Sequence, residues 1–541
     1  MKLDERACEA IQRGEAVLGI ELGSTRIKAV LLDGEHRPVA AGEYRWENKL
    51  DGKIWTYSLQ EAMEGVAAAY RAMASSLHQE NGVEIRNLAG VGISAMMHGY
   101  LPFDGEGRLL APFRTWRNTI TGQASEELSR LFGFAVPQRW SVAHLYQAVL
   151  NGEAHVRDLR FLTTLAGYVH WQLTGVKALG VGDASGMFPL GADGAYDQRM
   201  LTQFSELVKN KGYPWDIGEL LPEIRRAGEP AGFLTERGAK LLDADGLLRP
   251  GAPFCPPEGD AGTGMVATNA VAPRTGNVSA GTSIFAMIVL EQPLSRIHPE
   301  IDIVATPAGS PVAMVHCNNC TTDLNAWVSL FEDFCRRAGL DISQDALYSA
   351  FFDAAEAAEP DAGGLTGYGY FSGEHITGFE EGRPLLVYPP QARFSFANLA
   401  RSILFSSLAT LSIGMDVLRE EQVKIDSVLG HGGLYKGGAA GQRFTAAALS
   451  TPVSVMETAG EGGAWGAGLL AAYMAWKPEG ESLPDYLNGK VFDRMSGSRL
   501  DPDPRDVEGF QAYVKRFKAG FPVQRAAVDR LGKGKTEGGD A

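Results

Sequence analysis

The sequence has little cysteine and no long apolar segment. Five cysteines occur in 541 residues, and so few thiols, in odd number, are typical of a protein kept reduced in the cytosol rather than of a disulfide-bonded secreted one. The N-terminal residues lack the apolar stretch of a signal peptide. We find no run of about 18 apolar residues that would predict a membrane-spanning helix. We therefore expect a cytoplasmic protein with no membrane partner.

Positive charge is scarce as well. The chain has 50 Lys and Arg against 65 Asp and Glu, a formal net charge of −15, and it has no basic block. This balance argues against nucleic acid or an anionic membrane surface as the main partner, since both attract basic patches. A phosphorylated ligand remains compatible with it, because local backbone groups can bind phosphate in an acidic protein.

The chain also offers few metal ligands in a recognisable spacing. Cys317 and Cys320 form one CxxC pair. A zinc site would need two more ligands at similar spacing, and His316 alone does not supply them. We expect two ordinary thiols rather than a structural metal or redox centre.

Glycine, in contrast, is abundant. It makes up 65 of the 541 residues, which is well above the usual share of roughly 7%. Many of these glycines follow apolar, strand-like stretches. Residues 16–33 are typical of a strand, a tight turn at Leu22-Gly23-Ser24-Thr25 and a second strand, and residues 276–290 repeat this pattern around Ala280-Gly281-Thr282-Ser283. Two such copies predict an α/β protein with two halves of similar architecture.

Two more glycine-rich turns follow apolar stretches, near 430–438 and 459–468. Glycine allows positive φ and a close approach of the backbone to a ligand, and successive N–H groups in such turns bind anions. The closing of a hairpin explains any one of the turns as well. The four turns together favour loops that hold a ligand at the edge of a sheet.

Eight motifs then follow one another in an order that is typical of one enzyme family. They are GIELGSTRIKAVLLD, SAMMHG, TWRN, DASG, EGDAGTG, SAGTS, GHGGLYKG and ETAGEGGAWGAG. Together they resemble the FGGY carbohydrate kinases, which belong to the sugar kinase/Hsp70/actin superfamily. The resemblance runs over most of the chain, from residue 17 to residue 520.

The resemblance implies an α/β fold of two ribonuclease H-like (actin-like ATPase) domains that flank an interdomain cleft. We expect an N-terminal extension over residues 1–16 and a sugar-binding domain with the catalytic base over 17–268. An ATP-binding domain is expected over 269–520. The polar, glycine-rich end of the chain suggests a disordered tail over 521–541.

The family binds ATP and Mg²⁺, and nine residues here match its phosphate and adenosine motifs. Glu21 stands where the family usually has Asp. One extra methylene moves the carboxylate by about 1.5 Å, a shift that a water-mediated contact to Mg²⁺ can absorb, so we expect Glu21 near the metal. Lys28 can also be read as a solvated strand residue. The nine nucleotide-binding candidates are Gly23, Ser24, Thr25, Lys28, Gly281, Thr282, Ser283, Gly432 and Gly433.

The later nucleotide motifs depart from the family in part. His431 replaces the third glycine of the adenosine motif. Glu461 could reach the ribose, although a carboxylate at a helix N-terminus explains it more simply.

The resemblance assigns the general base to Asp260, in the segment Glu258-Gly259-Asp260-Ala261. Phosphoryl transfer needs alignment, charge neutralisation and a carboxylate that accepts the proton of the attacking hydroxyl. On local sequence alone, an Asp that caps the following helix is an equally good interpretation. Ala261 stands where the family has Gln or Asn, so one expected sugar contact is missing.

Two motifs are expected to form the sugar pocket. Met97-His98-Gly99 matches the MHG of the xylulokinase branch, in which histidine can bind a hydroxyl as donor or acceptor and methionine supplies an adaptable apolar wall. Trp116 falls at the Trp-x-Asp position of the family, and the Asp of that motif is Asn118 here.

Further pocket candidates come from the DASG motif and from single positions. Asp183 and Ser185 match a substrate-side motif, although a simple turn explains them as well. His144 and Tyr168 stand where the family has additional pocket residues.

The resemblance thus predicts an ATP-dependent kinase that phosphorylates the terminal hydroxyl of a ketopentose, with Asp260 as base. The MHG motif favours D-xylulose, while the departures at Glu21, Asn118 and Ala261 mark a divergent branch and keep L-ribulose open. Another ketose or a polyol such as erythritol or glycerol is an alternative substrate. A non-catalytic sugar or nucleotide sensor is an alternative function, although such a protein would be expected to lose Asp260 or a phosphate turn. Family members are commonly dimers, so a homodimer is compatible with the sequence.

Overall fold

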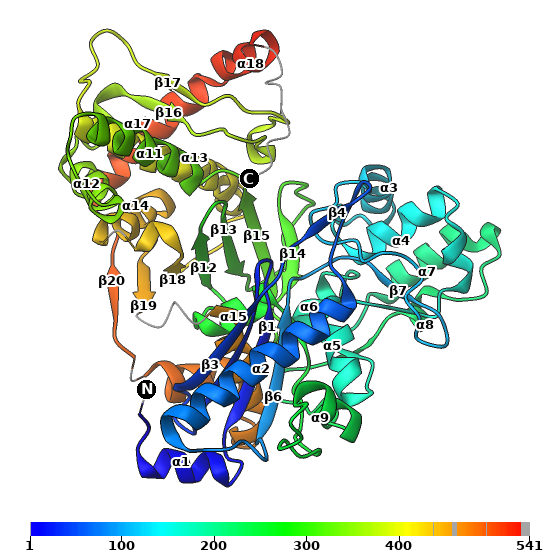
Figure 1. Cartoon of the computed structure of the whole chain (residues 1–541). Helices are drawn as coiled ribbons and strands as arrows, with labels where there is room; N and C mark the ends of the chain where they lie inside the picture. The colour runs from blue at the N-terminus through cyan, green and yellow to red at the C-terminus, as the bar shows by residue number, and fades with distance from the viewer. Residues whose placement is uncertain (1, 437, 457–461, 494, 532–541) are drawn as a thin grey trace. The chain divides into compact units, whose positions relative to one another are not determined.

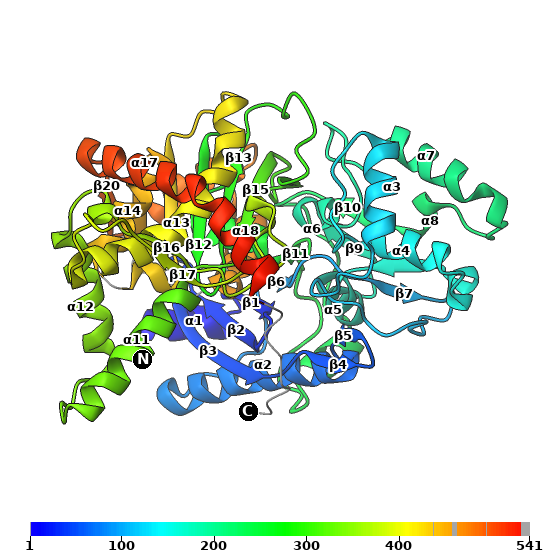
Figure 2. The ribbon, with the colours of Figure 1, turned by 90° about the horizontal axis from the view of Figure 1, so that it is seen from above.

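A computed structural model describes residues 2–436, 438–456, 462–493 and 495–531. The chain divides into two compact units (Figures 1 and 2). Unit 1 comprises residues 1–273, 302–312 and 460–495, and unit 2 comprises residues 274–301, 313–459 and 496–541. Both units are therefore discontinuous in sequence, and the predicted domain limits at 17–268 and 269–520 stay predictions.

Unit 1 is built on a five-stranded mixed sheet in the order β11-β6-β1-β2-β3. Strands β1, β6 and β11 run parallel, while β2 and β3 are antiparallel to their neighbours. Its strands are β1 (Val17–Leu22), β2 (Arg26–Leu32), β3 (Pro38–Arg45), β6 (Gly90–Ala95) and β11 (Glu258–Gly259).

Two helices pack on this sheet, and the residues of β1 explain how. Leu18 and Ile20 belong to the core that also contains Val66 of α2 (Leu59–Asn81). Gly19 lies between them and faces the opposite way, where a Cβ would lie 2.0 Å from the backbone oxygen of Ala464 in α15 (Gly462–Trp476). Glycine in the strand therefore lets α15 approach closely. Figure 2 shows α2 alongside β1, β2 and β3.

The rest of unit 1 is mostly helical. Its short strand pairs are β4 (Lys49–Asp51) with β5 (Ile54–Thr56), β7 (Leu101–Phe103) with β8 (Phe161–Thr163), and β9 (Ala178–Gly180) with β10 (Glu223–Arg225). Residues 302–312 add β14 (Asp302–Ala305). The helices are α1 (Glu5–Gln12), α3 (Gly122–Phe132), α4 (Ser141–Leu150), α5 (Leu165–Thr174), α6 (Val181–Ser185), α7 (Gln198–Val208), α8 (Ile217–Leu220), α9 (Glu236–Leu242), α10 (Asp260–Ala267), α16 (Leu483–Tyr486) and the π-helical η6 (Leu487–Phe492).

Unit 2 repeats the central motif of unit 1. Strand β12 forms an antiparallel hairpin with β13 and a parallel pair with β18, as β1 does with β2 and β6. Six strands follow one another in the order β15-β13-β12-β18-β19-β20. They are β12 (Thr275–Ala280), β13 (Ile284–Val289), β15 (Pro311–Cys317), β18 (Ser427–His431), β19 (Val453–Met456) and β20 (Gly497–Leu500).

The other elements of unit 2 are mainly helices. A small hairpin is formed by β16 (Thr366–Tyr368) and β17 (Leu385–Val387). The helices are α11 (Thr321–Arg337), α12 (Gln344–Ala357), α13 (Phe396–Glu420), α14 (Ala439–Leu449), α17 (Pro504–Ala519) and α18 (Phe521–Arg530).

Helix α13 is the one described helix that is long and apolar enough to span a membrane by length and composition. Its apolar window has a mean hydropathy of 1.3, and 83% of that window is buried inside the structure. The helix contains no uninterrupted run of about 18 apolar residues, because serine and threonine residues are scattered along it. Because most of this window is buried, α13 is a core helix of unit 2.

The predicted fold class, α/β with two ribonuclease H-like halves, is confirmed by the repeated hairpin-and-parallel-strand motif. The tail differs from expectation, since residues 521–530 form α18. Phe521 packs edge-on against Phe379 and Phe517, with ring centroids 5.7 Å apart in both pairs. The aromatic contacts order a segment that composition alone assigned to the disordered tail, and residues 532–541 lie outside the described part of the chain.

Candidate functional site

The carboxyl ends of three parallel strands meet at one edge of the sheet in unit 1. Glu21 of β1 and Glu258 of β11 both pair with Ser94 of β6. Because the strands run in the same direction, the loops that follow them begin at the same edge, where open α/β sheets bind ligands. The first phosphate turn, the MHG segment and the predicted base are thus brought together.

Asp260 is the first residue of α10. Its Oδ1 accepts hydrogen bonds from the N–H of Ala261 at 2.9 Å and from the N–H of Met97 at 3.2 Å. The side chain is accessible to solvent, yet the surrounding protein raises its pKa, chiefly through loss of hydration, while the two N–H groups oppose this effect. Gly259 occupies the N-cap position. A fixed and accessible carboxylate of raised pKa has the properties that a general base needs.

Glu21 points at the N-terminus of α15. The N–H of Ala464 donates to its Oε2 at 3.2 Å, and a Cβ on Gly463 would lie 2.5 Å from Oε1. Burial raises the pKa of Glu21 to about 7, the charge of Asp260 adds to this, and the N–H groups and Lys28 oppose it.

Glu21 is compatible with a bound Mg²⁺. The described residues contain no group of three or more His, Cys, Asp and Glu side chains placed to hold a metal. Mg²⁺ bound to a nucleotide needs only one or two protein carboxylates besides phosphate and water. The charge of Asp260 raises the pKa of Glu21, and a divalent cation stabilises neighbouring carboxylates of this kind.

The MHG segment has a strained backbone. His98 has φ +68° and Gly99 has φ +93°, and a positive φ is rare for residues other than glycine. The ring of His98 is buried, and its Nδ1 lies 3.2 Å from the carbonyl oxygen of Gly186. Burial, followed by the charge of Arg139, lowers its pKa to about 3. His98 is therefore neutral at physiological pH, and donation from Nδ1 to the carbonyl leaves Nε2 as an acceptor.

Asp183 is fully buried at the start of α6. Thr164 Oγ1 donates to its Oδ2 at 2.6 Å, while its Oδ1 has no hydrogen-bond partner. That Oδ1 would lie 3.3 Å from a Cβ placed on Gly259, beside the predicted base. Burial raises the pKa of Asp183 to about 7, and the charge of Asp260 adds to this.

Glu258 is a site residue that the motif comparison missed. It is buried, and its carboxylate accepts from the N–H of Asp183 at 2.9 Å and from the N–H of Gly182 at 3.3 Å. Burial and the charge of Asp183 raise its pKa to about 8. An acidic residue two positions before the predicted base was the available signal in the sequence.

The side chain of Asn118 has a structural role, because it binds the backbone of two neighbouring segments. Its Nδ2 donates to the carbonyl of Trp55 at 2.8 Å and to that of Thr115 at 3.0 Å, while its Oδ1 accepts from the N–H of Trp55 at 2.9 Å. A carboxylate cannot donate, so this pairing explains an amide at a position where the family has Asp. Trp116, two residues earlier, is 40% exposed, which leaves its ring available to a ligand.

Three further candidates of unit 1 lie among neighbours from the same unit, and their role in a pocket stays a prediction. Tyr168 stacks on Phe103 at 5.7 Å between ring centroids. Ser185 donates to the carbonyl of Gly182 at 2.5 Å and accepts from the N–H of Ala305 at 2.9 Å. His144 is fully buried, neither of its ring nitrogens has a partner among the described atoms, and burial lowers its pKa to about 3.

Side chains from outside the first phosphate turn donate hydrogen bonds to its backbone. Gly23 donates to the carbonyl of Arg26 at 2.9 Å. The indole of Trp46 donates to the carbonyl of Gly23, and the hydroxyl of Tyr57 donates to that of Ser24, both at 2.7 Å. Ser24 and Thr25 are themselves exposed, so their hydroxyls face solvent. Lys28 pairs with Glu21 in the register of β1 and β2.

In unit 2, the second phosphate turn lies beside the adenosine motif. Gly281 to Ser283 follow β12, and Gly432 follows β18, its parallel neighbour. Gly432 has φ +104°, and a Cβ there would lie 2.5 Å from the carbonyl oxygen of Ala280. Only glycine fits this close approach. Gly433 lies beside it, and Glu461 lies outside the described residues.

The N-terminus of α11 is fixed to the second phosphate turn. The N–H and the Oγ1 of Thr321 both donate to the carbonyl of Gly281, at 3.1 and 2.8 Å, and the N–H of Cys320 donates to that of Thr282 at 3.0 Å. Cys317 and Cys320 are buried and free.

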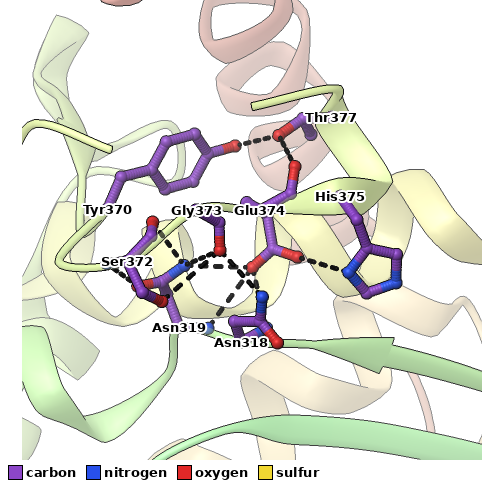
Figure 3. A network of polar contacts seen from close by, with 8 residues as sticks. All are labelled: Asn318, Asn319, Tyr370, Ser372, Gly373, Glu374, His375 and Thr377. Atoms are coloured by element: carbon purple, nitrogen blue, oxygen red, sulfur yellow. Dashed lines mark hydrogen bonds and ion pairs between the residues drawn. The ribbon is translucent and has the colours of Figure 1, made fainter. Parts of the chain in front are cut away.

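A buried carboxylate holds the loop that leads into α11 (Figure 3). Glu374 Oε2 accepts from the N–H of Asn318 at 2.9 Å and from the Nδ2 of Asn319 at 3.1 Å. Asn319 Oδ1 in turn accepts from the N–H of Ser372 at 2.9 Å. Burial raises the pKa of Glu374 to about 7, and the bonds from both asparagines oppose this. The network supports the segment that contacts Gly281 and Thr282.

Known proteins match the chain along most of its length. The model of the N-terminal domain of the FGGY family of carbohydrate kinases matches residues 16–249, and that of the C-terminal domain matches residues 276–475. A xylulose kinase of Haemophilus influenzae is 22% identical over 521 residues, which are 92% of this chain and 98% of the relative.

Solved structures show the same fold. A ligand-bound xylulose kinase from Lactobacillus acidophilus has a TM-score of 0.77 at 15% identity and covers 96% of this chain and 100% of its own. A gluconate kinase from the same organism also has a TM-score of 0.77 at 15% identity, with 96% and 99% covered. The likeness of fold therefore does not distinguish between sugars. The two family models cover most of the sequence, and the chain belongs to the FGGY family of carbohydrate kinases.

Proposed function

We propose that the protein is an ATP-dependent pentulokinase that phosphorylates the terminal hydroxyl of a ketopentose, D-xylulose or L-ribulose. The observation that carries this proposal is Asp260, an accessible carboxylate of raised pKa held by the N–H groups of Met97 and Ala261. Asp260 takes the proton of the attacking hydroxyl, the hydroxyl oxygen attacks the γ-phosphorus of ATP, and ADP leaves as the bond from the γ-phosphorus to the β–γ bridging oxygen breaks. The buried and unpartnered Oδ1 of Asp183 and the neutral ring of His98 bind other sugar hydroxyls.

The nucleotide is assigned to the two glycine-hydroxyl turns and the adenosine motif. Backbone N–H and hydroxyl groups at 23–25 and 281–283, where Ser24, Thr25 and Thr282 are exposed, bind phosphate oxygens, with Lys28 adding positive charge. Gly432 and Gly433 let the adenosine lie against the backbone. Mg²⁺ would neutralise charge on the phosphates, and Glu21 is the carboxylate that we propose would hold it. We also propose a cytoplasmic location and leave a homodimer as compatible.

The choice of a pentulose as the substrate rests on the MHG segment and on the xylulose kinase relative. The departures at Asn118 and Ala261 keep L-ribulose as the second candidate. Gluconate and glycerol are the contrasting substrates, because kinases of both are among the similar proteins.

The test is an ADP-release assay with D-xylulose, L-ribulose, D-gluconate, glycerol and erythritol at equal concentrations, with a sugar-free control. We expect the highest kcat/KM with one of the two pentuloses. A higher kcat/KM with gluconate or a polyol would overturn the pentulose assignment. If the folded protein binds ATP but none of the five compounds causes it to release ADP, the result would favour the non-catalytic sensor.

A further inference from the structure

Glu258 is a buried acid whose contacts in the described structure are backbone N–H groups rather than a cation. Its carboxylate lies against the first turn of α6 and accepts from Gly182 and Asp183. An ionisable group in such a place is costly unless it is hydrogen-bonded. Its position therefore calls for an explanation beyond packing.

The backbone of α6 is shaped around this carboxylate. A Cβ on Gly180 would lie 2.1 Å from Glu258 Oε1, and one on Gly182 would lie 2.5 Å from Oε2. Neither glycine has a positive φ, so conformation does not require glycine at these positions. The absence of two side chains is what gives Glu258 access to the N–H groups.

The residue held in this way is Asp183. Its N–H is bound by Glu258, its Oδ2 is bound by Thr164, and its Oδ1 is buried with no partner. A buried polar atom without a partner costs free energy, and a ligand that donates a hydrogen bond removes this cost. The free oxygen lies beside Gly259, next to the predicted base.

We propose that Glu258 is a positioning residue, which fixes α6 so that the free Oδ1 of Asp183 receives a second hydroxyl of the sugar. The inference rests on the proposed function. It adds a requirement for the substrate, namely a hydroxyl donor besides the one that is phosphorylated. A substrate analogue that lacks this hydroxyl leaves Asp183 unpaired and is rejected.

The contact between Glu258 and the N–H groups of α6 can be broken by a substitution in either partner. Glu258→Gln places an NH₂ group against a backbone N–H, and Gly182→Ala displaces the carboxyl group of Glu258 without changing its chemistry. Gly489→Ala is the matched control, because a Cβ there meets nothing within 4 Å. Both test variants are expected to raise the KM for the sugar about tenfold or more, a loss typical of one hydrogen bond to a substrate hydroxyl. The KM for ATP is expected to change less than twofold, and the control to match wild type.

A double-mutant cycle separates positioning from general damage. If Glu258 acts through Asp183, Glu258→Gln has no further effect on the sugar KM in an Asp183→Asn background. The proposal would be overturned if the effects of the two substitutions on the sugar KM multiplied. It would also be overturned if the KM for the sugar and the KM for ATP rose equally.

Hydrogen exchange over residues 180–186 without ligand provides a readout that needs no activity. Protection is expected to fall in Glu258→Gln and Gly182→Ala and to remain in Gly489→Ala. If wild type phosphorylates no sugar, the proposed function fails, and the exchange data still decide whether Glu258 fixes α6. Unchanged protection in both test variants would refute the positioning role.

Discussion

The N–H of Ala464 donates to the carboxylate of Glu21 at 3.2 Å, across 443 positions of sequence. The bond joins the end of β1 to the first turn of α15, where N–H groups lack partners within the helix. The N-terminus of a helix also favours a negative charge. The longer side chain of Glu, compared with the Asp of the family, thus gives Glu21 a task besides its predicted place near Mg²⁺.

Glu21→Asp separates these two tasks. The shorter side chain draws the carboxylate away from Ala464 by about one C–C bond, 1.5 Å, and we expect the free energy of unfolding to fall by about 1 kcal/mol, as for loss of a helix cap. Urea denaturation measures this fall. The Mg²⁺ concentration for half-maximal turnover is expected to change less than threefold, because the charge remains. Glu21→Gln removes the charge, and a Mg²⁺ requirement unchanged in that variant would count against a role near the metal.

The buried acids make stability depend on pH. The folded-state pKa of Glu258 is about 8 against a usual 4.5, so the folded chain holds this proton more tightly than the unfolded chain does. Its stabilising contribution is complete below about pH 4.5 and is lost as the pH rises through 8.

Relative to Glu258→Gln, the wild-type free energy of unfolding should therefore decrease between pH 5 and pH 8. The slope is at most about 1.4 kcal/mol per pH unit. Asp183 contributes in the same direction between its usual 3.8 and about 7 in both proteins. Denaturant titrations across this range give the difference, and a wild-type curve parallel to that of the variant would show that Glu258 stays ionised in the folded state.

Gly432 should not tolerate a side chain. Its φ of +104° is unfavourable for alanine, and the new Cβ would meet the carbonyl oxygen of Ala280 at 2.5 Å. We expect Gly432→Ala to lose about 1–3 kcal/mol of stability and at least tenfold in ADP affinity, measured by calorimetry. Gly433→Ala is the control for stability, because its Cβ would lie an ordinary 3.8 Å from the same oxygen. Equal stability of the two variants would contradict the close approach.

The repeated hairpin could be predicted from the sequence because alternating apolar strands and glycine turns are local features. Asp260, Met97 and Gly281 were assigned to the site through the resemblance to the family, whose motifs are also local in sequence. The capping of α15 by Glu21 and the contact of Glu258 with α6 could not be found in this way, since they join residues far apart in sequence. Asn118 shows the same limit: its amide looks like an altered sugar ligand until its bonds to Trp55 and Thr115 are seen.

The most direct test of the account is Asp260→Asn, which keeps the shape of the side chain and removes its ability to accept a proton. We predict that sugar-dependent ADP release falls by at least about 10² in kcat, the usual contribution of a general base. The affinity for ADP, measured by calorimetry on the same protein, should stay within twofold of wild type, because the proposed adenosine and second phosphate motifs lie on other strands. Turnover of Asp260→Asn within threefold of wild type would contradict the assignment of the base and, with it, the proposed mechanism.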